Sequence, residues 1–253
     1  MPVKVDIIIL SYAKTDKLRQ ITLDCIDSLQ ISEDPQKIQF EILVIESNKA
    51  MQPYHYPGTN TIYPDTPFGY NKYMNIGIKR TNNNYICLCN NDLIFHSNWA
   101  TEILKAFEGH PEISSVNPYS ENFDYHDKIK NSDNVIRRDK TLDINGVLMG
   151  HCIFIKRTIF KKIGLLDERF TFWYADNDYD LTLRKHGVKH ALVKSSLVTH
   201  LFCQSHDLLS ERKEELTNGQ RAVFENKWQK KILIQAAIKK LTRWFGNKST
   251  FLA

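Results

Sequence analysis

The 253-residue sequence predicts an α/β fold with a mostly parallel central sheet. Short, unbroken apolar runs alternate with amphipathic stretches through the first half of the chain, as strands joined by crossover helices require. The composition, with 42% hydrophobic and 25% charged residues, is that of an ordinary globular protein and excludes a disordered or fibrous class. A chain of this length buries enough surface to fold without a disulfide or a structural metal.

Three apolar runs, at 5–10, 40–46 and 85–90, predict buried strands. The helix expected between the first two strands spans 15–30, because apolar residues recur there at helical spacing behind Thr15, a favoured N-cap residue. These apolar residues are Leu18, Ile21, Cys25, Ile26 and Leu29.

The stretch from 53 to 69 contains four of the eight prolines, so it predicts a loop with one short strand at 61–63. A second helix is expected at 70–80, shortly before the strand at 85–90. The order strand, helix, strand, loop, helix, strand is typical of a Rossmann-like nucleotide-binding half.

The second half of the chain is less regular. Residues 117–146 are polar and predict a long surface loop or an inserted hairpin. The elements expected after it are a strand at 152–155, a short helix near 157–163, a helix at 177–186, a strand at 188–193 and mostly helix from 207 to 245.

The net charge of +5 favours acidic partners but does not identify a nucleic-acid binder, so nucleic acid is kept open only as an acceptor. Six basic residues and no acidic one lie between Lys227 and Arg243. The amphipathic stretch 227–245 therefore predicts one of two contacts: an anionic membrane interface, or the rest of the protein or a second copy of the chain.

Five cysteines without metal-binding spacing indicate a reducing compartment and a cytoplasmic location. The stretch 227–245 leaves open a peripheral contact with the cytoplasmic face of the membrane. The first ten residues have too short an apolar run for a signal peptide. Cys87 and Cys89 are two apart in a predicted strand, so their side chains should point to the same side.

Polar residues follow each of the three predicted strands. They are Ser11 and Tyr12, then Glu46, then Asn90, Asn91 and Asp92. Because ligands of parallel sheets bind at the carboxyl ends of the strands, these residues predict one shared crevice. A carboxylate held after a buried strand suits a Mg²⁺ or Mn²⁺ ion, although Asp92 could equally cap the helix expected near 97.

A second polar cluster lies at 170–187, where Asp176, Asp178 and Asp180 alternate at the start of a predicted helix. Acids at a helix N-terminus favour the helix dipole, and Asp180 is placed to pair with Arg184. Aromatic residues beside carboxylates also suit a sugar ring and its hydroxyl, so Trp173 and Tyr174 are candidates for acceptor binding or for the core. A lone histidine, His200, follows a later apolar run.

Together these segments resemble the family-2 glycosyltransferases of the GT-A fold, from about Val5 to His200. VDIIILSYAK and FEILVIESN resemble the first two strands of that family, and GYNKYMNIGIKRTNNNYICLCNND resembles its Asn-x-Gly helix and the strand before its DxD-type metal motif. GHCIFIKRTIFKKIGLLDERF is similar to the segment before the acceptor site, DNDYDLTLRKHG to the ED motif and its helix, and VTH to the late metal-binding histidine. The order and spacing of the motifs make the resemblance specific.

The resemblance implies an enzyme that moves a sugar from a nucleotide-diphosphate sugar to a glycan or other hydroxyl acceptor, with metal assistance and inversion. The implied donor-binding residues are Ser11, Tyr12, Glu46, Lys72, Asn75, Asn90, Asn91 and Asp92. Asp92 and His200 would bind Mn²⁺ or Mg²⁺, and Trp173, Tyr174 and Asp180 would bind the acceptor. The implied catalytic domain spans 1–206, with a nucleotide-sugar half at 1–96, an acceptor half at 97–206 and a helical extension at 207–253; a homo-oligomer stays open.

Asp178 matches the second letter of the ED motif, which implies the general base. The sequence departs from the family at Asn177, which stands where the motif has Glu, so Asp176 competes for the role of base. It also departs at Asn90, where the first acid of the DxD motif is expected. A third departure is Met74, where the family often has an arginine; nearby Lys72 is the candidate phosphate contact in its place.

Two alternatives to a glycosyltransferase stay open. A nucleotidyltransferase would share the fold, but SYAKTDKLR lacks the glycine-rich phosphate loop expected after its first strand. A sugar-nucleotide or glycan-binding module without catalysis would explain the amides Asn90 and Asn177.

Overall fold

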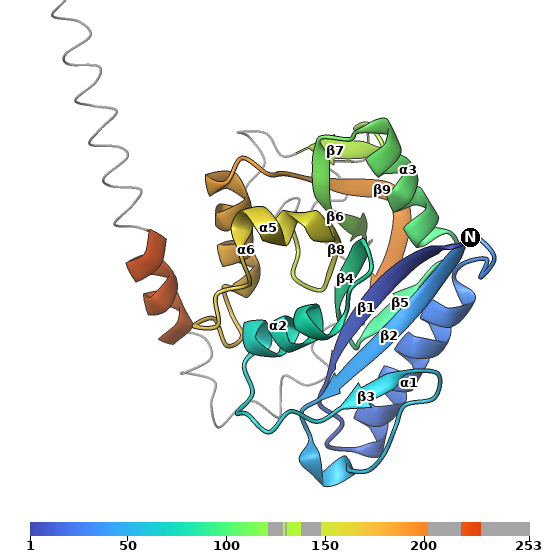
Figure 1. Ribbon diagram of the computed structural model, residues 1–253, viewed down its shortest axis with the longest axis vertical. Coiled ribbons are helices and arrows are strands. Elements are labelled where there is room, and N and C mark those ends of the chain that lie inside the picture. The colour runs from blue at the N-terminus through green and yellow to red at the C-terminus, as the bar shows by residue number, and fades with distance from the viewer. Residues whose placement is uncertain (121–128, 130, 138–147, 202–218, 229–253) are drawn as a thin grey trace, which may run out of the picture.

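The computed structural model of the chain describes residues 1–120, 129, 131–137, 148–201 and 219–228. Its strands are β1 (Val3–Ser11), β2 (Ile38–Glu46), β3 (Asn60–Ile62), β4 (Tyr85–Asn90), β5 (Leu93–Phe95), β6 (Ile113–Tyr119), β7 (Val135–Arg137), β8 (Cys152–Lys156) and β9 (Lys189–His200). Within this part of the chain they form one nine-stranded sheet in the order β3-β2-β1-β4-β8-β6-β9-β5, with β7 paired to β9 (Figure 1). The predicted α/β class is confirmed.

The first four strands pair in parallel, as predicted; helices connect β1 to β2 and β3 to β4, and a loop with a 3₁₀ turn connects β2 to β3. The helices of the described chain are α1 (Asp16–Ile31), α2 (Tyr70–Arg80), α3 (Trp99–Gly109), α5 (Phe160–Ile163) and α6 (Ala175–Lys185), with 3₁₀ turns η1 (Lys49–Met51) and η3 (Arg157–Ile159). Helix α1 begins as expected, because the Thr15 hydroxyl accepts a hydrogen bond from the Leu18 backbone N–H.

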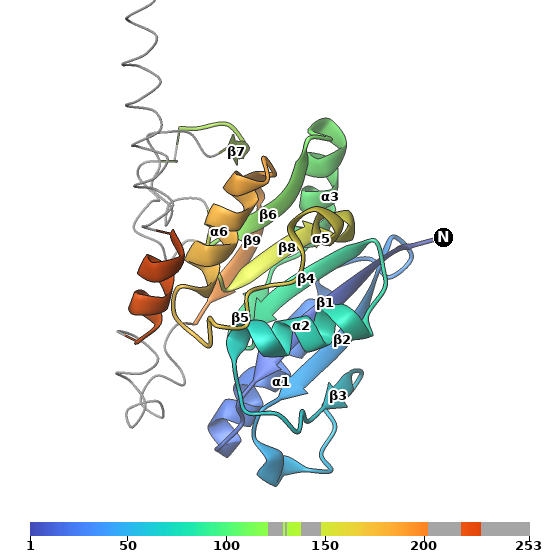
Figure 2. The ribbon, with the colours of Figure 1, turned by 60° about the vertical axis from the view of Figure 1, so that its left-hand side comes forward.

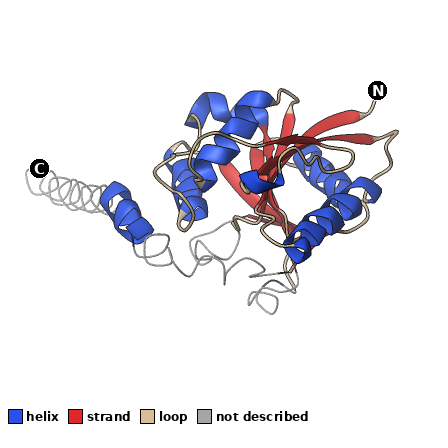
Figure 3. Cartoon of the chain, turned by 90° about the horizontal axis from the view of Figure 1, so that it is seen from below, coloured by secondary structure: helices blue, strands red, loops and turns tan. Residues whose placement is uncertain are grey.

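Helices cover both faces of the sheet (Figure 3). Helices α1 and α3 pack on one face and α2 and α6 on the other, as Figures 1 and 2 both show. Side chains of β1 alternate between these two layers, since Ile7 and Ile9 contact the α1 and α3 side and Ile8 the α2 side. From Ile7 to Leu10 both faces of β1 are therefore apolar, whereas the buried Asp6 pairs with Arg157 at 2.6 Å and the strand ends on Ser11.

The second half of the sheet is mixed, because β8 runs antiparallel to both β4 and β6 while β6 and β9 are parallel. The range 117–146, predicted as a loop or an inserted hairpin, is wrong at residues 117–119, which belong to β6. Strand β7 also lies in this range, and 121–128, 130 and 138–147 lie outside the described residues. Strand β6 was hidden by its polar residues Ser115 and Asn117, which are fully buried and hydrogen-bonded to His190.

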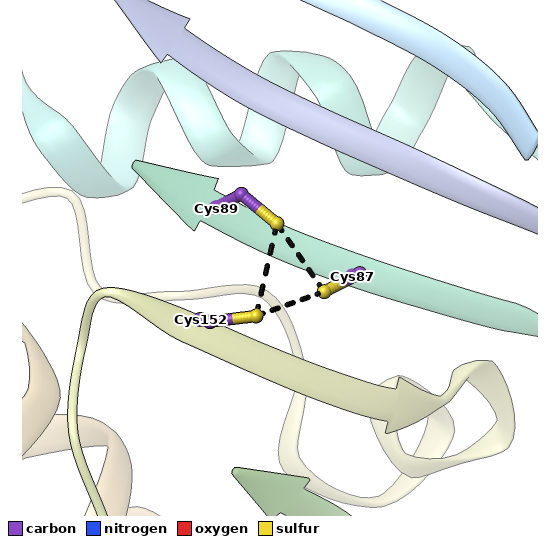
Figure 4. Close-up of side chains that lie close together, drawn as sticks. All are labelled: Cys87, Cys89 and Cys152. Carbon is purple, nitrogen blue, oxygen red and sulfur yellow. Dashed lines mark hydrogen bonds between the residues drawn. The ribbon is translucent and has the colours of Figure 1, made fainter. Parts of the chain in front are cut away.

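Three thiols meet between β4 and β8 (Figure 4). The Sγ atoms of Cys87, Cys89 and Cys152 lie 3.3, 3.6 and 4.0 Å apart, which confirms that the first two side chains point to the same side. Burial raises the pKa of each thiol well above its usual range, so all three stay protonated as small core side chains.

The C-terminal stretch is described only in part. Residues 219–228 are helical and lie beside α6 (Figure 2), whereas the rest of the helix expected at 207–245 lies outside the described residues. Lys227 and Trp228, the first two residues of the predicted amphipathic stretch, contact Asp178 within the same chain. None of the described helices is long and apolar enough to cross a membrane.

Candidate functional site

The polar ends of the first three long strands lie at one edge of the sheet, as predicted. In the parallel register, Ser11 of β1 pairs with Glu46 of β2, and Leu10 of β1 pairs with Asn90 of β4. The three strand ends are therefore in register, and the loops that follow them converge.

Ser11 and Glu46 form a buried network at this edge. The Ser11 hydroxyl donates to Oε2 of Glu46 at 2.6 Å, and the hydroxyl of Tyr56 donates to the same oxygen at 3.1 Å. The other carboxylate oxygen accepts from the backbone N–H of Asn48 at 2.7 Å. Glu46 is fully buried, so its contacts order the loops after β1 and β2. Tyr12 lies on the first of these loops and is half-buried.

A cavity of about 420 Å³ opens beside the end of β4. Its lining brings together four of the predicted site residues, Asn90, Trp173, Asp176 and His200, from three separate parts of the chain. Sequence reasoning missed the rest of the lining, which consists of Tyr70, Leu148, Met149, Gly150, His151, Phe172 and Ala175.

Asp92 and His200 are neighbours beside this cavity. Strand β5 pairs antiparallel with β9, and this pairing places Nε2 of His200 at 3.1 Å from Oδ1 of Asp92. The His200 ring stacks on His151, with centroids 4.8 Å apart and planes 11° from parallel. Burial and the neighbouring His200 lower the pKa of His151 to about 3, so this imidazole is neutral. Asp92 does not cap a helix, because α3 begins at Trp99 behind Asn98.

Asp176 lies in the first turn of α6 and contacts the loop before β8. A Cβ on Gly150 would lie 3.2 Å from Cβ of Asp176 and 3.4 Å from its Oδ2, so a side chain at position 150 would displace Asp176 by a few tenths of an ångström. The backbone N–H of Asn177 donates to Oδ1 at 2.9 Å. Burial nevertheless dominates and raises the pKa of Asp176 above its usual range.

A buried polar node holds the loop that contains Gly150. The Asn117 amide donates to the carbonyls of Met149 and Cys152 and accepts from the Met149 N–H at 3.0 Å. His190 contacts the same amide oxygen at 2.9 Å. In the sequence, Asn117 is the first residue of the polar range 117–146, which predicted a loop or an inserted hairpin and gave no sign of this node.

Asp178 faces a different cavity. This second cavity, of about 320 Å³, is lined by Asp178, Lys227 and Trp228 among others, and by none of the residues that line the first. Oδ1 of Asp178 lies 2.6 Å from Nζ of Lys227 and accepts a hydrogen bond from Nε1 of Trp228 at 2.7 Å. Asp178 is 3% exposed, and both of these partners belong to helix 219–228.

The remaining predicted site residues on α2, after β4 and around the start of α6 do not line the first cavity. Asn75 is buried and bonds both backbone groups of Leu166, and the Asn91 amide donates to Thr22. Asp180 is buried beside Arg184 at 3.2 Å, as the helical spacing predicted. The ring of Tyr174 packs on Phe224 with centroids 5.2 Å apart, and Lys72 is half-buried on α2.

Solved glycosyltransferase structures share this fold. One is GalNAc-T7 with UDP, GalNAc and Mn²⁺, at a TM-score of 0.58 and 14% identity over 79% of this chain and 44% of that chain. Another is the mannosyltransferase PcManGT from Pyrobaculum calidifontis in complex with GDP-Man and Mn²⁺, at a TM-score of 0.57 and 12% identity over 81% of this chain and 58% of that chain. The chain thus spans less than two thirds of the length of either, and the likeness shows the GT-A fold.

A comparison with curated protein sequences gives no significant match. The sequence model of one family, described as glycosyl transferase family 2, matches residues 6–164. This match covers more than half of the chain and includes β1, α2, β4 and the loop with Gly150. The chain therefore belongs to glycosyl transferase family 2.

Proposed function

We propose that the chain transfers a sugar from a nucleotide-diphosphate sugar to an acceptor hydroxyl by direct displacement, with inversion at the anomeric carbon. The observation that supports this most is the shared cavity of Asn90, Asp176 and His200, at the carboxyl edge of a nucleotide-binding type of sheet. Membership of the family and the UDP and GDP-Man in the similar structures agree with a nucleotide-sugar donor.

The donor set beside the cavity fits a hard divalent cation. Oδ1 of Asp92 is buried and receives no well-aligned hydrogen bond from the described residues, and Nε2 of His200 is 3.1 Å away. Adjacent ligands of an octahedral ion with bonds of about 2.1 Å lie about 3.0 Å apart, so these two atoms suit one ion. Asp92 and His200 would hold Mn²⁺ or Mg²⁺, and the bound ion would offset the negative charge that develops on the leaving diphosphate.

Asp176 is the general base of this proposal. The acceptor oxygen bonds to the anomeric carbon, the bond from this carbon to the diphosphate oxygen breaks, and its electron pair leaves with the nucleotide. Asp176 takes the hydroxyl proton during the attack. Asp178 is the weaker candidate, because Lys227 and Trp228 already engage its carboxylate and it lines the other cavity.

Trp173 is the proposed acceptor contact. Its side chain is 47% exposed although it lines the cavity, and an aromatic face of this kind packs well against a sugar ring. Tyr12 is the corresponding proposal for the donor, since it is half-buried on the loop that Ser11 and Glu46 order.

Donor binding tests this proposal first. Thermal unfolding would be followed with a set of nucleotide sugars, with and without Mn²⁺, because a ligand that binds only the folded state raises its stability. We expect one class of donor to raise Tm in the presence of Mn²⁺ and to be hydrolysed slowly. A donor that binds and is never hydrolysed or transferred would indicate a binding module without catalysis, and no stabilisation by any nucleotide sugar would contradict the proposal.

A further inference from the structure

Helix 219–228 contacts the segment 170–176 at two places, at residues 170–171 and at Tyr174. At the start of the segment, the backbone N–H of Thr171 donates to the side-chain oxygen of Gln220 at 2.8 Å, and Phe170 packs on Phe224 with centroids 6.4 Å apart. At the other end, Tyr174 packs on the same Phe224. Phe172 and Trp173, between these contacts, and Asp176, two residues after Tyr174, line the first cavity.

The backbone of this segment needs such support. Tyr174 has φ of 64°, the left-handed region that non-glycine residues rarely adopt, and it precedes α6 without a side-chain cap. A bulky residue keeps this conformation only where surrounding contacts enforce it. The ring contact of Tyr174 with Phe224 and the hydrogen bond that the Thr171 N–H, three residues earlier, donates to Gln220 are contacts of this kind.

An ion pair between Lys227 and Asp178 connects helix 219–228 to α6. Lys227 lies 2.6 Å from Asp178 and 2.8 Å from Asp167, and its side chain is 16% exposed. A buried carboxylate is costly without a cation, so Lys227 and the Trp228 N–H stabilise Asp178 in its position one turn into α6. The same turn of α6 contains Asp176, on the side of the first cavity.

We infer that helix 219–228 is a positioning element of the active site, and that Asp178 is a positioning residue through which it fixes Trp173 and Asp176 in the cavity. This inference rests on the proposed function, since it assigns the proton transfer to Asp176. Helix 219–228 thereby contributes to turnover. Asp178, the acid that matches the family motif, acts by pairing with Lys227 and takes no part in proton transfer.

The test measures kcat, the KM of the donor and the pH profile of kcat for three variants of the full chain. Lys227→Met is expected to lower kcat by about 10- to 100-fold, the loss that a small displacement of catalytic groups causes, with little change in donor KM. Lys227→Arg should retain most of the activity, and Trp228→Phe should show a smaller loss in the same direction. None of the three variants should move the acid limb of the profile. This limb reports the titration of Asp176, and the variants change only groups that contact Asp178.

The matched control is Arg221→Gln. Arg221 lies on the same helix, its side chain is 63% exposed and it pairs with Glu225 one turn later, so this change should leave kcat unchanged. The double variant Asp178→Asn with Lys227→Met should lose no more than the worse single variant, since both remove one interaction. Hydrogen exchange in 170–176 should rise in Lys227→Met while β1 and β4 stay protected.

Two results would overturn the inference: folded Lys227→Met with full kcat, or multiplicative losses in the double variant. Asp176→Asn is run beside them to separate the two claims. If Asp176→Asn is inactive and Lys227→Met fully active, the inference fails and the proposed function stands. If Asp176→Asn is fully active, the proposed function fails first. Should Lys227→Met unfold, Trp228→Phe decides the question, because it removes the N–H donor to Asp178 and keeps both Lys227 and an aromatic ring at position 228.

Discussion

Nε2 of His200 lies 3.1 Å from Oδ1 of Asp92, although the two residues are 108 positions apart in the chain. The antiparallel pairing of β5 with β9, which places Leu93 opposite His200, fixes this approach. In the proposed function these two groups hold a divalent cation, and the first prediction concerns that cation.

His200→Ala should raise the Mn²⁺ concentration needed for half-maximal activity by at least about tenfold, since one ligand of the ion is lost. The measurement is a Mn²⁺ titration of donor turnover. His55→Ala is the control, because His55 is exposed on the loop before β3. Equal Mn²⁺ requirements in wild type and His200→Ala would contradict the assignment of this ligand.

Gly150→Ala should lower kcat by about tenfold or more while the protein stays folded. The new methyl group would lie 3.2 Å from Cβ of Asp176 and would push the carboxylate away from its position in the cavity. Gly109→Ala is the matched control, since a Cβ there meets nothing within 4 Å. Unchanged turnover in Gly150→Ala would show that the position of Asp176 is unimportant.

The acid limb of the pH profile of kcat should lie at a higher pH than an ordinary aspartate gives. Asp176 accepts a proton only when it is ionised, and burial raises its pKa above the usual value. Activity is therefore present above this raised pKa and lost as the pH falls through it. An acid limb at or below the usual pKa of an aspartate would exclude Asp176 as the titrating base.

Gly77→Ala should destabilise the fold rather than change the site. Its Cβ would lie 2.6 Å from Cδ1 of Ile8, so α2 would have to move away from β1. Overpacking of this kind costs about 1 to 3 kcal/mol, partly offset by the better helix propensity of alanine, about 1 kcal/mol. Chemical denaturation should therefore give a lower free energy of unfolding than for Gly109→Ala, and an equal or higher value would contradict the tight packing of α2 on β1.

The sequence predicted the parallel half of the sheet well, because its strands are buried on both faces and its helices have regular apolar spacing. The predicted helix at 70–80 and the strand at 85–90 match α2 and β4 at both ends. Strand β6 was missed because its polar residues are satisfied by partners distant in sequence, such as His190. Local pattern cannot show such partners.

The candidate site was likewise predictable only in part. Strand-end residues such as Asn90 could be named, because a parallel sheet always gathers its carboxyl ends. Which acid of 176–180 faces the cavity could not be predicted, since that depends on Gly150 on one side of α6 and Lys227 on the other. Both are far from α6 in the sequence, and their contacts form only in the folded chain.

The most direct measurement compares sugar transfer by Asp176→Asn and Asp178→Asn at a pH well above the acid limb, with donor binding confirmed for both. Loss of a general base costs about 10²- to 10⁴-fold in rate, so Asp176→Asn should fall by this amount. Asp178→Asn should keep a greater share of its kcat and an unmoved acid limb, because its carboxylate pairs with Lys227. Full transfer by Asp176→Asn would contradict the assignment of the base, and loss of the acid limb in Asp178→Asn would assign that role to Asp178.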